Sequence, residues 1–328
     1  MKTGKLSPEF LKNHIFPYLG KKREEVLVRA QIGEDSAVLN FGENLAVFSV
    51  DPITGAGKNM GYISVNVALN DVVTNGAEPL ALMYSILLPE TIKEDEIISL
   101  MKEVHSTAAS LNVEIVGGHT EVTEGVRFPI LTAFAIGQVK KDLLLTSSSA
   151  KPGNAIIITK GVGIEGTAIL ADRFSNELEK EFGLEFVEKA KAYIKKISVI
   201  QEALLVREYV TSMHDATEGG IYGGIYELSY ASGSGFVIDE ESIPVSDETR
   251  KICEYFNINP YFLISSGTLI ITTNKEDKVL KILKENNIPA WKIGIMKEEA
   301  ERFIKRKGKL YPFIPQVRDE LWKILERG

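Results

Sequence analysis

The sequence predicts a mixed α/β protein built from two domains of similar size. Short runs of β-branched and aromatic residues alternate with segments of helical period in both halves of the chain. The serine-rich segment Thr146–Gly153 interrupts this pattern near the middle. We therefore expect an N-terminal domain at 1–149 and a C-terminal domain at 150–328, and 328 residues are enough for two separate cores.

In the N-terminal half, a helix is expected to start at Ser7-Pro8, because serine is a favoured N-cap and proline suits the first turn. The run Gly57–Pro79 reads as one helix, and Asp95–Leu111 has the period of an amphipathic helix. Strands are expected, from their apolar patterns, at Val26–Val28, Ala37–Leu39, Leu45–Asp51, Leu80–Leu88, Val113–Val116 and Ile130–Val139.

The C-terminal half opens with an apolar strand, Ala155–Lys160, which leads into the glycine-rich turn Gly161–Gly166 and a helix. Further strands are expected at Gly235–Ile238, Thr268–Thr273, Trp291–Met296 and Glu301–Lys305. Further helices are expected at Glu185–Lys195, Val199–Glu208, Gly219–Ser232, Asp247–Phe256, Glu276–Glu285 and Val317–Leu325.

Charge and composition exclude several classes of protein. A net charge of -7 argues against a nucleic-acid partner, and the basic run Lys305–Lys309 reads as a solvated hairpin. Cys253 is the single cysteine, so an internal disulfide or a multi-cysteine zinc site is excluded, and we expect an inert structural thiol. No segment has the apolar length of a signal peptide or a membrane span. We therefore expect a soluble cytoplasmic protein with no membrane partner.

The run Gly57–Pro79 is the most informative stretch. It carries Asn66, Asn70 and Asp71, and it follows a strand that ends in Asp51. A carboxylate beside two amides on a largely buried helix costs free energy unless a partner satisfies it. A metal ion, or a phosphate bound through one, is such a partner, and a polar network at a subunit interface is the alternative. The expected core positions of the helix are Met60, Ile63, Val67, Ala68, Val72 and Val73.

Four acidic positions stand beside glycines, at strand ends or on this helix: Asp35, Asp51, Asp71 and Asp215. Oxygen ligands of this kind suit Mg²⁺, which binds through a few carboxylates together with substrate phosphates. Three of the four also have a structural explanation, since Asp35 suits a turn, Asp51 a strand end and Asp215 an N-cap. Asp71 lies in the middle of a helix, where no capping role exists.

Three glycine-rich turns add backbone donors, and the last of them belongs to a turn at His214–Gly220 that is expected to lead into a helix. The segment Val116–Glu121 follows a strand, and its successive amides are expected to form an anion-binding nest. The segments Gly161–Gly166 and Gly219-Gly220 precede helices, whose N-terminal amides favour phosphate, although a tight turn alone also explains such glycines. His119 is a candidate to donate to a phosphate or to polarise an acceptor oxygen, with a structural loop histidine as the alternative. The P-loop and dinucleotide fingerprints are absent from the sequence.

Taken together, these motifs resemble the PurM-like ATP-binding superfamily. The matching segments, in the order seen in that superfamily, are Gly33–Val38, Asn70-Asp71 with Gly76-Ala77, Gly117–Thr120 and Asp215–Gly220. The resemblance extends from about Pro8 to Pro315. The runs Ile156–Leu170 and Leu263–Leu269 look like the AIR synthase-related branch that contains the hydrogenase maturation protein HypE.

The resemblance implies a two-domain PurM-like fold in which the N-terminal strands of two subunits join into a shared barrel. It also implies a homodimer that binds ATP and Mg²⁺ and phosphorylates an amide or carbonyl oxygen of a small or protein-borne substrate, as in hydrogenase maturation. The implied metal ligands are Asp35, Asp51, Asp71 and Asp215, and the implied catalytic residues are His119 and Asp71. The implied nucleotide-binding residues are Asn70, Gly117, Gly118, Thr120, Lys160, Gly161, Gly219 and Gly220.

The sequence departs from the HypE pattern in one respect that matters for the chemistry. HypE proteins end in a cysteine that carries the carbamoyl group, whereas this sequence ends Leu325-Glu-Arg-Gly328. We therefore expect no dehydration on the chain's own tail, if that terminus is complete. Two alternative functions stay open from the sequence: a cyclo-ligase like aminoimidazole ribonucleotide synthetase, and a maturation scaffold that binds nucleotide without turnover.

Overall fold

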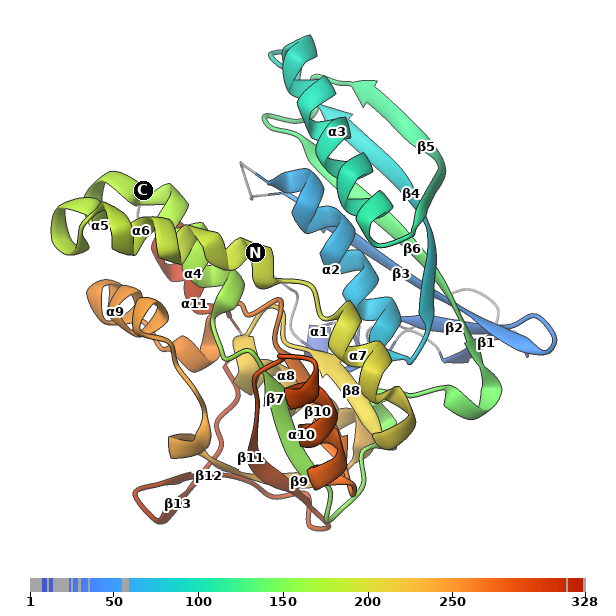
Figure 1. The fold of residues 1–328 in the computed structure, drawn as a ribbon, viewed down its shortest axis with the longest axis vertical. Coiled ribbons are helices and arrows are strands. Elements are labelled where there is room, and N and C mark those ends of the chain that lie inside the picture. Colours follow the sequence, from blue (N-terminus) through green and yellow to red (C-terminus); the bar gives the residue numbers. More distant parts are fainter. Residues whose placement is uncertain are drawn as a thin grey trace. The chain divides into compact units, whose positions relative to one another are not determined.

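The computed structural model of the chain describes residues 8–10, 12–13, 24, 26–28, 31–34, 36–54, 59–316 and 318–326. These residues divide into two compact units (Figure 1). The N-terminal unit is drawn from Glu24–Arg29 and Asp35–Leu144, and the C-terminal unit from Met1–Arg23, Ala30–Glu34 and Leu145–Gly328. Each unit contains one mixed β-sheet with helices packed on it, which confirms the predicted mixed α/β class.

The N-terminal unit contains a six-stranded sheet of order β1-β2-β3-β6-β4-β5. Strands β3 and β4 both run antiparallel to β6, and β5 runs parallel to β4. The connections β3-α2-β4 and β4-α3-β5 are therefore crossovers of the kind that places helices on a face of the sheet. The elements of this unit are β1 Val26–Val28, β2 Ala37–Asn40, β3 Asn44–Ile53, α2 Met60–Thr74, β4 Glu78–Leu88, α3 Glu94–Ser110, β5 Glu114–Val122, β6 Ile130–Lys140 and η3 Lys141–Leu143.

The core of this unit lies between the sheet and helix α2. Alternate residues of β4, among them Leu82, Tyr84 and Ile86, are buried, as expected for side chains that point to one face of a strand. Helices α2 and α3 pack side by side (Figure 1). The predicted core positions of α2 are all buried, which confirms that face of the helix: Met60, Ile63, Val67, Ala68, Val72 and Val73.

The opposite face of the same sheet carries exposed apolar side chains. Val50 of β3 pairs with Phe134 of β6, which in turn pairs with Met83 of β4. The three side chains thus lie side by side across three strands, and they are 51%, 43% and 42% exposed. An apolar row of this kind is typical of an interaction surface.

The C-terminal unit contains a seven-stranded sheet of order β13-β12-β9-β11-β7-β10-β8. Its strands are β7 Ala155–Thr159, β8 Ser212–Asp215, β9 Gly235–Asp239, β10 Leu269–Thr273, β11 Ala290–Lys297, β12 Arg302–Arg306 and β13 Lys309–Pro312. Its α-helices are α1 Pro8–Phe10, α4 Ile164–Arg173, α5 Ser175–Phe182, α6 Leu184–Lys191, α7 Ile200–Val206, α8 Gly220–Ser232, α9 Asp247–Phe256, α10 Glu276–Glu285 and α11 Glu320–Leu325. Short 3₁₀ turns occur at η4 Ser147–Ser149, η5 Ala192–Lys196, η6 Arg207–Tyr209, η7 Glu240–Ser242 and η8 Pro260–Phe262.

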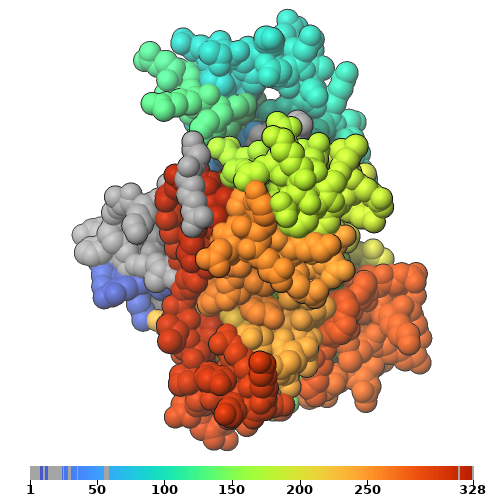
Figure 2. All heavy atoms as spheres, turned by 90° about the vertical axis from the view of Figure 1, so that its left-hand side faces the viewer, coloured from blue at the N-terminus to red at the C-terminus, as the bar shows by residue number. Residues whose placement is uncertain are grey.

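Buried residues of this unit lie both in the sheet and among the helices. Every residue of β7 and β10 is buried, as expected for strands that are covered on both faces. A second apolar cluster joins α4, α5 and α6 to α9 and α11 through residues such as Leu170, Val187, Ile252 and Leu321. Figure 2 shows the yellow-green residues of the first three helices lying directly against the orange and red ones of the other two.

Four local predictions are wrong. The segment Val116–Glu121, expected as a turn, lies within strand β5, and His214-Asp215 lie in strand β8 and not in a turn. The helix expected to reach Pro79 ends at Thr74, and β4 already begins at Glu78. The last helix begins at Glu320 rather than at Val317, which lies outside the described residues. The helix start at Ser7 also lies outside them.

Two other expectations, on a hairpin and on the single cysteine, hold. The basic run Lys305–Lys309 forms the β12–β13 hairpin, as predicted. Cys253 is buried, and this burial raises the pKa of its thiol to about 12, in keeping with an inert thiol. Within the described part of the chain, no helix has both the length and the apolar character needed to cross a membrane.

Candidate functional site

Asp71 is held in place by a neighbouring strand. It lies half-buried on α2, and the Ser49 hydroxyl of β3 donates a hydrogen bond to its Oδ2 at 2.5 Å. Asp51 follows Ser49 by two residues in the same strand, so both side chains point to the face covered by α2. The structure therefore brings Asp51 and Asp71 to the same face of the N-terminal sheet.

The polar groups of helix α2 are largely satisfied within the unit. Asn66, 2% exposed, donates its Nδ2 to the carbonyl of Tyr62 at 2.8 Å. Asn70 is fully buried. Just past the helix, Asn75 accepts a hydrogen bond from Ser36. Asp35, which precedes Ser36 in the sequence, lies outside the described residues, and its role as a metal ligand stays a prediction.

The glycine segment of the N-terminal unit is an extended edge strand. Residues 83–86 of β4 pair in parallel register with Gly117, Gly118, His119 and Thr120. The sequence-based prediction of an anion-binding nest in this segment is therefore wrong. Successive amides of a strand alternate in direction and do not converge on one anion. The His119 side chain is 72% exposed, and its Nε2 lies 3.2 Å from Glu121 Oε2. An exposed edge strand can still contribute single amides and the imidazole to a ligand.

Asp215 belongs to the C-terminal unit. It is the last residue of β8, it is 2% exposed, and it pairs with Leu269 of β10. Strand β8 lies at the edge of its sheet, with β10 as its neighbour. The carboxylate thus stands where the chain leaves the sheet for the turn that begins α8.

The amides expected to bind phosphate at the start of α8 are already used. The Gly219 amide donates to Asp319 Oδ2 at 2.6 Å, and the Gly220 amide donates to the Thr217 carbonyl at 3.0 Å. The Trp322 indole donates to Glu218 Oε1 at 2.9 Å, which ties the same turn to α11. In this conformation a carboxylate of the chain takes the place predicted for a phosphate, so the assignment of Gly219 and Gly220 is not supported by their geometry.

The groups expected to bind phosphate just before α4 are also engaged by other groups of the chain. The Lys160 ammonium lies 2.6 Å from Glu202 Oε1 and donates to the Ser198 carbonyl at 2.5 Å. Burial lowers the pKa of this lysine, while the Glu202 carboxylate acts in the opposite direction. The Gly161 amide donates to the Thr159 carbonyl at 2.8 Å. The ion pair is thus internal, and the geometry disfavours Lys160 and Gly161 as phosphate ligands.

Two buried carboxyls in this region were missed by the sequence reasoning. Burial raises the pKa of Glu165 to about 7, and burial also raises the pKa of Asp319 to about 7. Asp319 accepts from the Leu321 amide at 2.8 Å as the N-cap of α11. An aspartate just before an apolar-periodic segment is a visible N-cap signal, whereas its contact with Gly219, a hundred residues away, is tertiary and carries no local signature.

These raised values predict a pH effect on stability. The folded-state pKa of Asp319 lies above its ordinary value of 3.8. Between about pH 4 and 7 this carboxyl therefore keeps its proton in the folded protein and loses it in the unfolded chain, so the free energy of unfolding falls as the pH rises. We expect the unfolding free energy of the wild type, relative to Asp319→Asn, to fall by about 2 kcal/mol from pH 5 to pH 7. Urea unfolding of both proteins at each pH measures this difference. Parallel pH profiles would contradict it.

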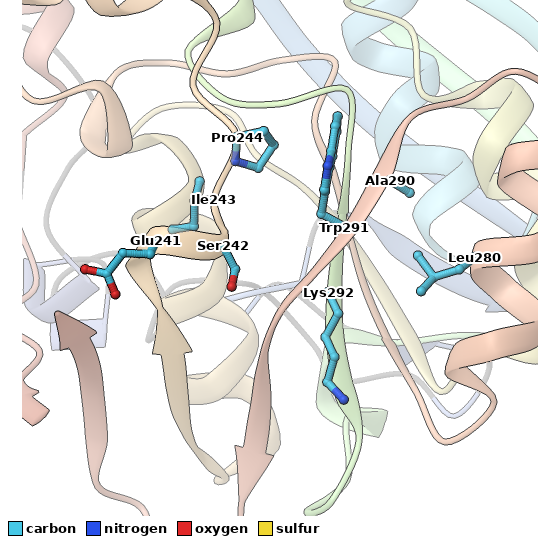
Figure 3. Close-up of a pocket in the computed structure, with 8 residues that line it drawn as sticks. All are labelled: Glu241, Ser242, Ile243, Pro244, Leu280, Ala290, Trp291 and Lys292. Atoms are coloured by element: carbon cyan, nitrogen blue, oxygen red, sulfur yellow. The ribbon is translucent and has the colours of Figure 1, made fainter. Parts of the chain in front are cut away.

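One cavity of about 530 Å³ lies elsewhere in the C-terminal unit. Figure 3 shows the Trp291 ring standing next to Pro244, with Lys292 pointing away from that ring. The lining of this cavity comes from the segment after β9, from α10 and from the start of β11, and it includes none of the residues predicted for the site. Among the described residues, no group of three or more histidine, cysteine, aspartate or glutamate side chains is arranged to hold a metal ion.

Both halves of the chain match known family models. The N-terminal and C-terminal domain models of AIR synthase related proteins match residues 33–139 and 151–306. A protein of Methanocaldococcus jannaschii described as a hydrogenase expression/formation protein is 30% identical over 295 residues, or 86% of this chain and 84% of that protein. The carbamoyl dehydratase HypE of Cupriavidus necator is 29% identical over 269 residues, or 79% of this chain and 74% of that protein.

A solved structure shares the fold over nearly the whole length. The crystal structure of the hydrogenase maturation protein HypE in complex with ATP superposes with a TM-score of 0.73 at 21% identity, and the match covers 98% of this chain and 97% of that one. The two-domain architecture of both chains is therefore the same.

Proposed function

This chain belongs to the family of AIR synthase related proteins, in the HypE-like branch of the PurM-like superfamily, and we propose that it is an enzyme that uses Mg-ATP in hydrogenase or related metallocofactor maturation. The reaction is the phosphorylation of an amide or carbonyl oxygen of a small or protein-borne substrate. Two likenesses support the proposal: a relative is named a carbamoyl dehydratase, and a protein of the same fold was solved with ATP. A carbamoyl group is therefore the substrate class that we propose.

The observation that carries this proposal is the placement of Asp51 and Asp71 on one face of the N-terminal sheet, with Asp71 oriented by the Ser49 hydroxyl. The donor chemistry fits Mg²⁺, which takes hard oxygen ligands and is usually held by one or two carboxylates, waters and substrate phosphates. A site of this kind does not need a closed cluster of protein ligands. We propose Asp35 and Asp215 as further carboxylates that bind a metal-nucleotide complex.

Phosphoryl transfer depends on positioning and on charge neutralisation more than on covalent help from the protein. Mg²⁺ held by these carboxylates supplies the neutralisation. Asp71 is oriented before any ligand binds, because its Oδ2 already accepts from Ser49. In the proposed step the substrate oxygen forms a bond to the γ-phosphorus of ATP, the bond to the bridging oxygen breaks, and ADP leaves. We propose that His119, exposed on the edge strand, donates to the transferred phosphoryl group.

Two measurements test this function. Calorimetric titration of the wild type with ATP should show binding with Mg²⁺ and at least about tenfold weaker binding without it. Incubation with ATP and a peptide that carries an ¹⁸O-labelled S-carbamoyl cysteine should then release phosphate that contains the label, because the phosphorylated oxygen leaves with the phosphate. Binding that ignores Mg²⁺ would overturn the ATP site, and unlabelled phosphate would overturn the carbamoyl substrate.

We propose that a second copy of the chain covers the open face of the N-terminal sheet. The exposed row Val50, Phe134 and Met83 is apolar and continuous across three strands, as a shared barrel between two subunits requires. Phe134→Lys places a charge in this row and should convert a dimer into a monomer, as measured by light scattering after size-exclusion chromatography. Phe128→Lys, at another exposed phenylalanine, is the matched control and should leave the mass unchanged. A monomeric wild type would contradict the proposal.

A further inference from the structure

A set of polar contacts around the buried His214 lies directly next to Asp215. His214, which is 2% exposed, has its Nε2 3.1 Å from Glu227 Oε2 and its Nδ1 3.5 Å from the Ser147 hydroxyl. The three residues come from β8, α8 and η4 of the C-terminal unit. The sequence reasoning did not connect them, because they are far apart along the chain.

The contacts are built to hold the imidazole. Residue 224 of α8 is glycine, and a Cβ at that position would lie 3.1 Å from His214 Cδ2 and 2.6 Å from Ile270 Cδ1. A side chain at 224 would therefore compete with the imidazole for space. On the other side, Glu34 accepts hydrogen bonds from the amides of Ser147 and Ser148, both at 3.3 Å, which fixes the turn that contacts Nδ1.

A nucleophilic role for Ser147 does not fit this arrangement. Ser147 is only 3% exposed and His214 only 2% exposed, so a substrate carbonyl has no access to the hydroxyl. Nucleophilic serines need both a base and room for the group that they attack. These contacts therefore hold the protein's own structure in place and do not act on a substrate.

The element that these contacts hold in place is the end of strand β8. This strand has four residues, lies at the edge of the sheet and pairs with β10. Adjacent residues of a strand point to opposite faces, so His214 faces α8 while Asp215 faces the other side. The contact between His214 and Glu227 links the end of β8 to the second turn of α8. It thereby holds together the two elements that the segment 215–219 connects.

We infer that His214 and Glu227 are positioning residues that fix the edge strand β8, and with it the orientation of the Asp215 carboxylate toward its ligand. The inference rests on the proposed function in one respect, which is that Asp215 binds the metal-nucleotide complex. Residues that orient a metal ligand from behind commonly change metal affinity by about 10- to 100-fold when they are replaced. Glu227→Ala removes the acceptor for His214, whereas Glu227→Gln keeps a carbonyl oxygen in its place.

Two readouts on the full chain test the inference. The first is the Mg²⁺ concentration that gives half of the maximal ATP binding, which should rise about tenfold in Glu227→Ala and in His214→Asn. The second is hydrogen–deuterium exchange of the peptide that covers 212–216, which should become at least about tenfold faster in the same two variants. Glu227→Gln should stay within about twofold of the wild type in both measurements.

A matched control separates positioning from general loss of stability. Thr249 is fully buried and its Oγ1 lies 2.8 Å from Thr167 Oγ1, so Thr249→Val removes a buried polar contact of the same unit. It should lower the melting temperature and leave both readouts unchanged. Unchanged exchange at 212–216 in Glu227→Ala overturns the inference, and so does an equal Mg²⁺ shift in Thr249→Val. If the wild type shows no Mg²⁺-dependent ATP binding, the proposed function fails, and the exchange measurement still decides the positioning role.

Discussion

Replacing Asp71 with asparagine should remove the Mg²⁺-dependent part of ATP binding while the chain stays folded. Asparagine has nearly the same shape, and its amide oxygen can still accept from the Ser49 hydroxyl that now donates to Asp71 Oδ2. What the variant loses is the negative charge, and Mg²⁺ prefers charged oxygen ligands. We expect the affinity for ATP in the presence of Mg²⁺ to fall about a hundredfold, or about 2.8 kcal/mol. Calorimetric titration with and without Mg²⁺ measures the change directly.

Two further variants sharpen this result. Ser49→Ala keeps the carboxylate and removes only its hydrogen-bond donor, so we expect a smaller loss, about tenfold. Asp95→Asn replaces an exposed carboxylate in the first turn of α3 and should leave ATP binding unchanged. A hundredfold loss in Asp71→Asn that is equally large without Mg²⁺ would show that Asp71 supports the fold or the dimer and does not bind the metal. Unchanged binding would remove Asp71 from the site.

The elements that the sequence predicted well are those whose pattern is local. Nearly every residue of helix α2 is buried, and burial of its apolar residues from Met60 to Val73 drives its formation, so the helix and its core positions followed from the apolar character and spacing of this run. The costly group on this helix, Asp71, was also recognised from the sequence. Its partner Ser49 was not, because a strand residue paired with a helix residue through space has no fixed separation in the chain.

The predictions that went wrong concern glycines and their amides. A glycine pair after a strand reads as a turn, but glycine is needed equally where two backbones approach closely, and the sequence does not distinguish the two uses. Gly118 is of the second kind and lies within β5. The amide of Gly219 was assigned to a phosphate because it precedes a helix, yet Asp319 of the C-terminal segment accepts its hydrogen bond. Which group occupies a helix N-terminus is decided by tertiary structure.

The close approach at Gly118 leads to the second large effect that we expect. Its φ is +148°, and a Cβ at this position would lie 2.2 Å from the Tyr84 carbonyl oxygen and 2.9 Å from the Tyr84 nitrogen. These are backbone atoms of the neighbouring strand β4, which cannot move without breaking the ladder between β4 and β5. Gly118→Ala should therefore lower the unfolding free energy by about 3 kcal/mol or more. Urea unfolding followed by circular dichroism, together with hydrogen exchange across 114–122, measures the loss.

The neighbouring glycine provides the control and decides what the pair is for. A Cβ at Gly117 would meet only Met83 Cε, at 3.9 Å, so Gly117→Ala carries the strain of its positive φ of +159° without a backbone clash and should cost about 1–2 kcal/mol. If Gly118 serves close strand pairing, its alanine variant unfolds early whether or not ATP is present, and its loss exceeds that of Gly117→Ala. If Gly118 instead serves the approach of a nucleotide, Gly118→Ala keeps its stability and loses ATP binding. The second outcome would restore the sequence-based assignment of Gly118 as a nucleotide ligand, and the first would make this glycine a requirement of the sheet.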